Sequence, residues 1–474
     1  MAETVVDRVA RHPALNLKVI IVGAGVGGLL SALECWRKGC DVVVLEKNKD
    51  ISLLGDFVTV PPSGISTFKL YPTMDEQYQK NFYDCTISIW NPEGKCLKRM
   101  FPEWRHVAEK GELPRASLLS RRSDFTRMLY DQCIRLGIPV YFSQAVQEIV
   151  EHDDHVVINT NQPGITLTAD VCVVANGIGY PSTKDITGID LPVLDSGYAI
   201  ARMAFPRSSI PKGSLAHQLV ENVDTQPEFR VYLSNDIHLI IWLTKDSGDG
   251  KAIESWHNLR ESAVLVDQLE QKCSSWDPAV IDFMRRIPGQ VVDWGLRSRD
   301  PVEQWTSAGG RIVMLGDAAH TFLPTAGNGA VQACEDAISI AECLRQGGKQ
   351  GAPWSTRVYN KLRFERTSIL QQTGFTNREE LHYANLDEIA RNPEISDIGF
   401  FKIGRWVWAH KPEAYAIENY QKCLDYLQTN GSSEFRNTNV PPGHVYRPWS
   451  MESEHARMTA GIRSDLKSNG DWSV

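Results

Sequence analysis

The sequence predicts an α/β fold in which a parallel sheet is wound with helices and is followed by a strand-rich segment and by C-terminal helices. Three observations lead to this prediction. An apolar run at 18–22 (KVIIV) ends in glycines, a helical pattern occupies 26–39, and a second apolar run follows at 41–47. A strand, a helix and a strand within about 30 residues form the βαβ unit of a parallel sheet.

The overall composition is that of a globular protein. The chain has 474 residues, a formal net charge of −8, 42% hydrophobic residues and 23% charged residues, which excludes a disordered chain. The mildly acidic balance also argues against a protein that grips nucleic acid, because phosphate binding needs a basic face. At about 150 residues per domain, the length corresponds to about three domains.

The cysteines and the N-terminus indicate a reducing compartment. The ten cysteines are too sparse for a disulfide scaffold and show no C-x-x-C spacing, so we expect buried thiols. Residues 1–16 lack the apolar core of a secretory signal, and no run approaches the ~20 apolar residues of a membrane span. We therefore expect a cytoplasmic protein with no membrane span, no metal site and no nucleic-acid partner.

The remaining elements follow from periodicity and from turn residues. In chain order they are a loose polar arm at 1–16, a helix at 123–137, strands at 138–176, a hairpin at 230–246, a strand at 311–315, a helix at 330–348 that stops at a glycine pair, a mainly helical stretch at 355–425, and a partly ordered tail after 430. No internal repeat or low-complexity segment interrupts them.

The glycine-rich stretch Gly23-Ala24-Gly25-Val26-Gly27-Gly28 has the spacing of a dinucleotide-binding loop. Gly23 permits the tight turn, Gly25 lets the backbone approach a pyrophosphate, and Gly28 lets the helix pack on the strand. The helix N-terminus offers N–H groups to the phosphates. Glu46, after the next strand, can bind a pair of ribose hydroxyls and disfavours a 2′-phosphate. This unit alone does not separate NAD from FAD.

A second block separates the two cofactors. It consists of Gly316-Asp317-Ala318-Ala319-His320, Pro324, Gly327-Asn328-Gly329 and Glu335-Asp336-Ala337. Together these segments resemble the signature of the flavin-dependent aromatic hydroxylases, the group A flavin monooxygenases. Asp317 can accept a hydrogen bond from a ribityl hydroxyl. The glycine turn before the helix can present N–H groups to an isoalloxazine edge, where negative charge develops on reduction.

The resemblance extends over about residues 17–420 and implies a Rossmann-like FAD-binding domain of the GR2/PHBH type with an inserted mixed β-sheet substrate domain. The FAD-binding domain would then be discontinuous in sequence. The segments expected are 17–190 (FAD-binding domain, first part), 191–299 (substrate-binding β-sheet domain), 300–350 (FAD-binding domain, second part), 351–430 (C-terminal helical region) and 431–474 (polar tail).

The same resemblance implies the cofactors. FAD would be bound non-covalently, NADPH would bind transiently as the reductant, and a flavin C4a-hydroperoxide formed with O2 would transfer one oxygen without a metal. Arg122, rather than the neighbouring Arg121, would reach the FAD through its guanidinium fork, whereas His320 would be structural. The cofactor-binding residues implied are Gly23, Gly25, Gly28, Glu46, Lys47, Thr59, Arg122, Asp317, Gly327, Asn328, Gly329 and Ala330.

Three positions depart from the family pattern. The usual A-D-G-I-x-S stretch is replaced by Ala175-Asn176-Gly177-Ile178-Gly179-Tyr180, so that both the acid and the serine are missing. Thr321 replaces a common proline, and Asn328 replaces a common glutamine. The first of these changes leaves the preference between NADPH and NADH open.

Two further segments point to a substrate class. Gly55-Asp56 and the stretch Ser196–Arg202 resemble fungal monooxygenases that epoxidise the indole C2–C3 bond of prenylated alkaloids and guide a semipinacol shift to a spiro-oxindole. That resemblance implies Asp56 and Arg202 as catalytic residues. Arg202 would orient the peroxide or a substrate carbonyl, and Asp56 would handle the proton that steers epoxide opening. The alternative for this pair is a structural ion pair or a loop cap.

Trp242 and Pro324 are the expected substrate contacts. Trp242 stands where phenol-binding relatives often carry a tyrosine, and it would give an aromatic wall for a polycyclic substrate, although a tryptophan in a strand is also ordinary core. The expected partners are therefore an indole alkaloid or another small aromatic molecule, and O2. The oligomeric state stays open.

Other functions use parts of the same pattern. Within the family, the alternative is ortho-hydroxylation of a phenolic, salicylate-like or polyketide aromatic substrate. A nicotinamide-dependent dehydrogenase would share the βαβ unit, but the block around Asp317 argues against it. A flavoprotein reductase would bind FAD without inserting oxygen.

Overall fold

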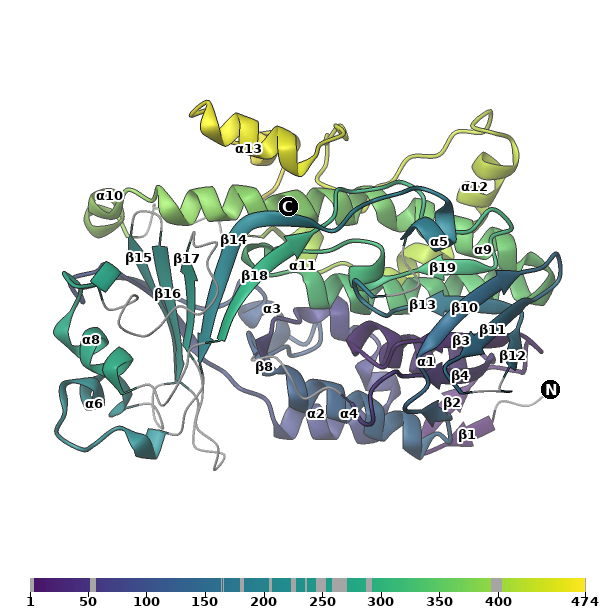
Figure 1. Ribbon diagram of the computed structural model, residues 1–474, viewed down its shortest axis with the longest axis horizontal. Helices are drawn as coiled ribbons and strands as arrows, with labels where there is room; N and C mark the ends of the chain where they lie inside the picture. The colour runs from purple at the N-terminus through teal and green to yellow at the C-terminus, as the bar shows by residue number, and fades with distance from the viewer. Residues whose placement is uncertain are drawn as a thin grey trace.

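The computed structural model contains two large sheets, and one long helix contacts both of them (Figure 1). It describes the whole chain except residues 1–3, 52–56, 163, 165, 180–182, 204–206, 223–226, 235–236, 244–252, 258–270, 287–291, 394–402 and 474. For residues 108–109, 201–203, 243, 253–257 and 292–294, the description is limited to the backbone.

A five-stranded parallel sheet forms one half of the molecule. Its strands, in spatial order, are β19 (Ile312–Met314), β13 (Val171–Val174), β3 (Lys18–Val22), β4 (Asp41–Leu45) and β9 (Val140–Tyr141). All four strand pairs are parallel. The central strands β3 and β13 are almost fully buried, as expected for a parallel sheet covered on both faces.

Helix α1 (Val26–Arg37) connects β3 to β4, as the βαβ pattern predicts. It packs against α4 (Arg122–Arg135) and α9 (Gly329–His382). The strand β19 joins the sheet only after the long excursion of the chain between residues 175 and 311. The sheet is therefore discontinuous in sequence.

A seven-stranded mixed sheet forms the other half. Its strands, in spatial order, are β18 (Val292–Ser298), β14 (Leu194–Met203), β17 (Ile253–His257), β16 (Ile237–Leu243), β15 (Glu228–Ser234), β6 (Thr86–Trp90) and β7 (Cys96–Met100). β15 and β16 form the predicted hairpin. β6 pairs in parallel with β15, so residues 86–100 extend a sheet that we had expected from residues 191–299 alone.

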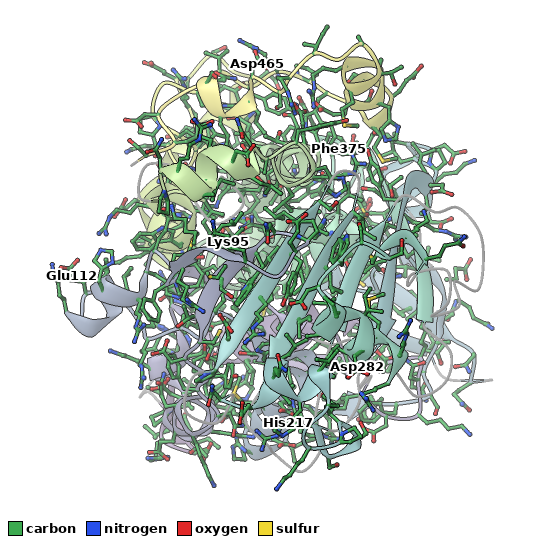
Figure 2. The ribbon with its side chains drawn as sticks, turned by 90° about the vertical axis from the view of Figure 1, so that its left-hand side faces the viewer. Lys95, Glu112, His217, Asp282, Phe375 and Asp465 are labelled. Carbon is green, nitrogen blue, oxygen red and sulfur yellow. The ribbon has the colours of Figure 1, made fainter. Side chains whose placement is uncertain are left out.

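The two faces of this sheet have different neighbours. Leu239 and Ile241 of β16 belong to a separate apolar cluster with α6 (Leu215–Val220) and α8 (Pro278–Arg285), on the side away from the parallel sheet (Figures 1 and 2). Ile240 and Trp242 belong to the main core. Because side chains alternate along a strand, Ile240 and Trp242 share the face that looks toward the parallel sheet.

Helix α9 is the longest element, with 54 residues. It is interrupted at Gly348, whose φ of 58° is not helical; the sequence predicted a stop at this glycine pair, and the helix instead bends and continues. The helices α10 (Leu386–Arg391), α11 (Arg405–Trp408) and α12 (Pro412–Gln428) follow, so the mainly helical character of 355–425 is confirmed among the residues described.

Shorter elements complete the chain. They are β1 (Thr4–Val6), β2 (Val9–Arg11), β5 (Phe57–Val58), α2 (Pro72–Lys80), α3 (Arg105–Glu109), β8 (Ser120–Arg121), β10 (Val146–Glu151), β11 (Val156–Thr160), β12 (Thr166–Ala169), α5 (Thr183–Thr187) and α13 (Met451–Thr459), with short 3-10 turns between them.

The two ends of the chain are more ordered than the sequence suggested. The expected loose arm contains the hairpin β1–β2, and Arg8 in its turn makes a 2.8 Å ion pair with Glu76 of α2. The tail after residue 430 packs along α9 and buries Met451 and Leu466. Both segments are polar by composition but are fixed by contacts with distant residues, which a local pattern does not reveal.

No helix in the described part of the chain combines the length and the apolar character needed to cross a membrane. Among the same residues, no three histidine, cysteine, aspartate or glutamate side chains gather as a metal site would require. All ten cysteines are free thiols, and nine of them are buried, as predicted.

Candidate functional site

Four loops that follow strands of the parallel sheet meet around one cavity of about 670 Å³. They are residues 23–25 after β3, 46–48 after β4, 175–177 after β13 and 315–317 after β19. Parallel sheets bind ligands at these carboxyl ends of their strands. The start of α9 and apolar side chains of the seven-stranded sheet close the cavity, which therefore lies between the two sheets.

The glycine loop after β3 is shaped by contacts that only glycine allows. Gly23 has a φ of 110°, and a Cβ at Gly28 would lie 2.0 Å from the carbonyl oxygen of Gly23. Gly25 lines the cavity, and a Cβ there would meet nothing within 4 Å. Gly25 is also the N-cap of α1 and provides no side-chain cap. The first N–H groups of α1 are thus available to an anionic ligand.

Glu46, directly after β4, lies beside the glycine loop and is hydrogen-bonded to it. Its Oε2 accepts a hydrogen bond from the Ala24 N–H at 2.8 Å, and its Oε1 accepts one from the Asn48 N–H at 2.9 Å. The carboxylate is therefore fixed in orientation while the residue lines the cavity. Each oxygen keeps a lone pair that can accept a hydrogen bond from a ribose hydroxyl.

The turn after β19 is held from behind by a buried acid. Asp336 accepts hydrogen bonds from the Gly316 N–H at 3.0 Å and from His320 Nε2 at 2.5 Å. His320 does not line the cavity, in keeping with the structural role expected for it. Asp317 does line the cavity. Its side chain is open to the cavity, yet desolvation by the surrounding protein raises the pKa of its carboxyl, and the charges of Arg122, His320 and Arg299 oppose that rise.

The N-terminus of α9 forms another wall. Gly327 adopts a φ of 62°, and Asn328 follows as the N-cap without a side-chain cap. Asn328 Nδ2 donates to the Ala326 carbonyl at 2.6 Å, while its buried Oδ1 has no partner among the described atoms. Because Asn328 lines the cavity, this acceptor is available to a donor on a bound ligand.

These groups fit FAD. Two uncapped helix N-termini suit a pyrophosphate and a ring that becomes anionic on reduction, Glu46 suits a ribose, and Asn328 Oδ1 suits a ligand donor. The cavity gathers all but one of the predicted cofactor residues: Gly23, Gly25, Glu46, Lys47, Thr59, Arg122, Asp317, Gly327, Asn328, Gly329 and Ala330. Gly28 lies behind the loop, where it permits the close packing described above.

The end of the cavity toward the seven-stranded sheet is apolar. The lining side chains there include Phe57, Ile87, Trp104, Leu118, Phe229, Ile240, Phe322 and Leu323. The Phe57 ring meets the Phe229 ring edge to face, with the centroids 5.9 Å apart and an interplanar angle of 89°. Pro324, a predicted substrate contact, also lines the cavity.

Trp242, the other predicted substrate contact, does not line the cavity. It packs behind Phe57, with the ring centroids 5.4 Å apart, and against Tyr83 at 5.8 Å. The structure therefore places Trp242 one layer behind the aromatic wall, where it supports Phe57.

The predicted catalytic pair cannot be placed as a pair. Asp56 lies outside the described residues. Arg202 is described by its backbone alone: it stands on β14, opposite Glu254 of β17 and Val292 of β18. The roles assigned to both residues remain predictions.

Comparison with known proteins identifies the family. Residues 16–371 match the family described as the FAD binding domain. The chain belongs to this family. The FAD-dependent monooxygenase fsr3 of Gibberella fujikuroi is 36% identical over 98% of this chain and 91% of its own length. The FAD-dependent monooxygenase mdpD of Emericella nidulans is 34% identical over 98% of this chain and 92% of its own length. The chain is a flavin-dependent monooxygenase that uses FAD.

A more distant relative has a more specific name. Notoamide E oxidase notB' of Aspergillus versicolor is 28% identical to this monooxygenase over 92% of the chain and 97% of its own length. The relatives named here are all fungal proteins and match nearly the whole chain.

Solved structures agree on the fold. FqzB superposes with a TM-score of 0.79 at 24% identity, covering 93% of this chain and 99% of FqzB. CtdE in complex with FAD and a substrate superposes with a TM-score of 0.76 at 24% identity, covering 87% of this chain and 100% of CtdE. A salicylate hydroxylase in a substrate complex superposes with a TM-score of 0.67 at 21% identity, covering 85% of this chain and 97% of the hydroxylase. The predicted fold class, an FAD-binding domain joined to a mixed sheet and C-terminal helices, is therefore confirmed.

Several residues at the site escaped the sequence analysis. Phe57 lies far in sequence from Phe229 and Ile240, which belong to the hairpin of β15 and β16, and nothing in their local pattern distinguishes the three from ordinary core. Arg299 is also new: it is buried, and its Nη1 and Nη2 lie 3.4 Å from the Ala318 and Ile178 carbonyls. In the sequence it stands in the polar stretch Arg297-Ser298-Arg299-Asp300, where nothing distinguishes it from a surface charge.

Proposed function

We propose that this monooxygenase oxygenates an extended, uncharged and electron-rich aromatic substrate of fungal secondary metabolism. The observation that carries the proposal is the apolar wall around Phe57, Phe229 and Ile240, at the end of the cavity opposite the polar loops. Among the described lining residues, the cations are Lys47 and Arg122, and both stand with the predicted FAD-binding groups. A carboxylate substrate would find no described cation at the apolar wall.

FAD, when bound, supplies the redox chemistry and the activation of O2, with NADPH as the reductant. The residues that would hold it are those of the four loops, with the α1 N-terminus and Arg122 at the phosphates, and Glu46 at a ribose. Asp317 would accept a hydrogen bond from the ribityl chain. The N–H groups at the start of α9 would stabilise negative charge on the reduced ring. The aromatic wall would hold the substrate and exclude water from the reacting atoms.

Indole 2,3-epoxidation with semipinacol rearrangement to a spiro-oxindole is the first candidate reaction. The similarity to notoamide E oxidase over 92% of the chain supports it. In this reaction Asp56 would handle the proton of epoxide opening and Arg202 would orient a substrate carbonyl. The edge-to-face aromatic wall suits the flat face of an indole.

Ortho-hydroxylation of a phenolic, polyketide-type aromatic ring is the second candidate. One observation weakens the indole alternative: fsr3 and mdpD, two of the relatives above 30% identity, are more similar to this chain than the notoamide oxidase, which is 28% identical. The position of Trp242 behind the wall also removes one reason to prefer an indole.

A substrate panel tests the proposal. The purified holoenzyme receives NADPH and ¹⁸O₂ with a prenylated indole alkaloid, a phenolic polycycle, or salicylate, and NADPH oxidation, H2O2 and product mass are measured. We expect one of the two polycyclic substrates to accelerate NADPH oxidation and to gain a single ¹⁸O, while salicylate has little effect. Preferential turnover of salicylate, or no acceleration by any electron-rich ring, would contradict the proposal.

A further inference from the structure

Glu103 joins two segments of the chain that are 300 residues apart. Its Oε2 accepts hydrogen bonds from the Ile403 N–H at 3.2 Å, the Gly404 N–H at 3.3 Å and the Trp408 Nε1–H at 3.1 Å. One carboxylate oxygen thus holds the entry into α11. Residues 403–408 lie beyond the stretch that matches the FAD-binding family, which ends at residue 371.

The neighbours of Glu103 on both segments line the cavity. Pro102 and Trp104 flank it in sequence, and Ile403 is one of its hydrogen-bond donors; all three are lining residues. Trp104 is buried, and its Nε1–H donates to the Ala116 carbonyl at 3.1 Å. Glu103 therefore stands at the seam where the loop before α3 and the entry into α11 meet to close the cavity.

The segment 403–408 is also fixed from its other side. Gly404 has a φ of 84°, and a Cβ there would lie 2.4 Å from the Trp472 carbonyl oxygen. Arg366 of α9 donates to the Trp406 and Val407 carbonyls, both at 2.9 Å. With α9 and the tail on one side, the contact with Glu103 sets how closely the segment approaches the cavity.

We propose that Glu103 is a positioning residue for the substrate, because it fastens the part of the cavity wall formed by Trp104 and Ile403. The proposal rests on the proposed function, in that the apolar end of the cavity is taken to hold the aromatic substrate. A charged oxygen that receives three N–H donors gives stronger hydrogen bonds than a neutral acceptor. Without it, the wall separates at the seam and water enters beside the substrate.

The test compares three variants of the holoenzyme. Glu103→Ala removes the acceptor, Glu103→Gln keeps a neutral one, and Asp282→Ala is the matched control. Asp282 also accepts a backbone N–H at the start of another helix, from Ala216 at 2.9 Å, but lies on the far side of the seven-stranded sheet with α6 and α8 (Figure 2). The measurements are KM and kcat for the polycyclic substrate that the wild type turns over, H2O2 released per NADPH oxidised, FAD affinity, and hydrogen exchange of the peptide that contains residues 403–408.

We expect Glu103→Ala to raise KM about tenfold, as for the loss of one charged hydrogen bond, with kcat changed less than about threefold. H2O2 release should rise, FAD affinity should stay unchanged, and the amides of 403–404 should exchange faster. Glu103→Gln should give values between those of the wild type and those of Glu103→Ala. Asp282→Ala should match the wild type in KM and in the exchange of the amides of 403–404.

Each outcome has one meaning. Unchanged exchange at 403–404 in Glu103→Ala overturns the fastening role, whether or not a substrate is known. Faster exchange with unchanged KM and H2O2 release overturns the role in substrate positioning. If the wild type turns over no aromatic substrate, the proposed function fails, while the exchange measurement still decides whether Glu103 fastens the wall.

Discussion

Gly25 and Gly28 stand three residues apart in one loop, yet different constraints act on them. A Cβ at Gly28 would collide with the Gly23 carbonyl, whereas a Cβ at Gly25 would stand in open space at the cavity. Gly25→Ala should therefore fold normally and bind FAD about tenfold more weakly or worse, because the methyl group occupies the approach of the pyrophosphate. Gly28→Ala should destabilise the protein by about 2 kcal/mol, because the backbone must move.

Two measurements separate these effects. Thermal unfolding of the apoproteins reports stability, and a titration with FAD reports affinity. A Gly25→Ala protein with wild-type FAD affinity would show that Gly25 does not face the pyrophosphate. A Gly28→Ala protein with wild-type unfolding would show that the loop can relax without cost.

Arg299 acts on the site through its neighbour Asp317. Arg299 does not line the cavity, but its charge is one of three that oppose the rise in the pKa of Asp317 caused by desolvation. In Arg299→Met that pKa should rise further, so protonation of Asp317 sets in at a higher pH as the pH falls. If ionised Asp317 accepts a ribityl hydroxyl, FAD affinity should decline from a higher pH in the variant than in the wild type.

The control for this prediction is Arg357→Met. Arg357 is partly buried and donates to two carbonyls, those of Pro353 at 3.0 Å and Ala308 at 2.6 Å, and like Arg299 it does not line the cavity. FAD dissociation constants between pH 5 and 8 compare the two variants. If the FAD dissociation constant depends on pH in the same way in Arg299→Met and in the wild type, Arg299 does not influence the protonation of Asp317.

What the sequence predicts at this scale depends on how local the signal is. Gly23, Gly25, Glu46 and Asp317 sit in contiguous motifs with fixed spacing, and the structure brings them to one cavity. Glu103 has no such signal, because its partners lie 300 residues away. The pair Asp56 and Arg202 stays a prediction.

At the scale of elements, α9 is anchored by buried charges. Arg363 donates to Asp336 at 2.8 Å and to Glu335 at 2.7 Å, and Arg366 donates to Glu335 at 2.8 Å. The same Asp336 holds the turn that carries Asp317. The two halves of α9 on either side of the Gly348 bend are thus tied together, and the tie extends to the predicted flavin-binding turn.

Glu335→Gln tests this anchor. Burial would raise the pKa of the Glu335 carboxyl, but Arg366 and Arg363 more than offset it, so the pKa lies well below its usual value. A carboxyl with a lowered folded-state pKa contributes stability above its unfolded pKa of about 4.3, and this contribution is lost as the pH falls below that value. The variant should be less stable by about 3–5 kcal/mol at neutral pH, because it leaves buried arginines uncompensated.

The difference between the variant and the wild type should shrink as the pH falls below about 4, where the wild type loses its own contribution. Urea unfolding at several pH values measures this. The control is Glu365→Gln on the same helix, since Glu365 makes only a 3.8 Å pair with Lys361 and its loss should cost less than about 1 kcal/mol. Equal effects of the two substitutions would rule out the anchor.

Elements were predictable where their periodicity was local. The βαβ unit, the hairpin of β15 and β16, and the C-terminal helices have the predicted type. The pairing of β6 with β15 was not predictable, because the residue pattern of a strand does not indicate which other strand it pairs with. The bend at Gly348 is an intermediate case: the sequence marked the position, and packing of α9 against α12 accompanies its continuation.

At the scale of the whole molecule, the tail after residue 430 acts as part of the fold. It runs over α9, which carries Phe375 (Figure 2). The Phe375 ring meets the rings of Trp449 and His455, with centroids 5.8 Å apart in both cases. Arg366 also donates to the Asn439 carbonyl at 3.0 Å. The tail therefore connects to the same buried charges that support the predicted flavin site, although its polar composition suggested partial order.

Two arginines of the tail provide a matched test of this view. Arg457 is mostly buried and pairs with Glu379 of α9 at 2.7 Å, with side chains 16% and 7% exposed, whereas Arg447 pairs with Asp465 at 2.9 Å with both side chains more than half exposed. Arg457→Met should cost about 2 kcal/mol of unfolding free energy, because it removes an arginine that two buried carboxylates share. Glu454 loses a 2.8 Å partner, and Glu379 keeps only the longer 3.4 Å contact with Arg463 among the arginines described. Arg447→Met should cost less than about 0.5 kcal/mol, as exposed ion pairs do. Urea unfolding followed by tryptophan fluorescence distinguishes these values, and a loss of stability in Arg457→Met as small as that in Arg447→Met would mean that the tail rests on α9 without stabilising it.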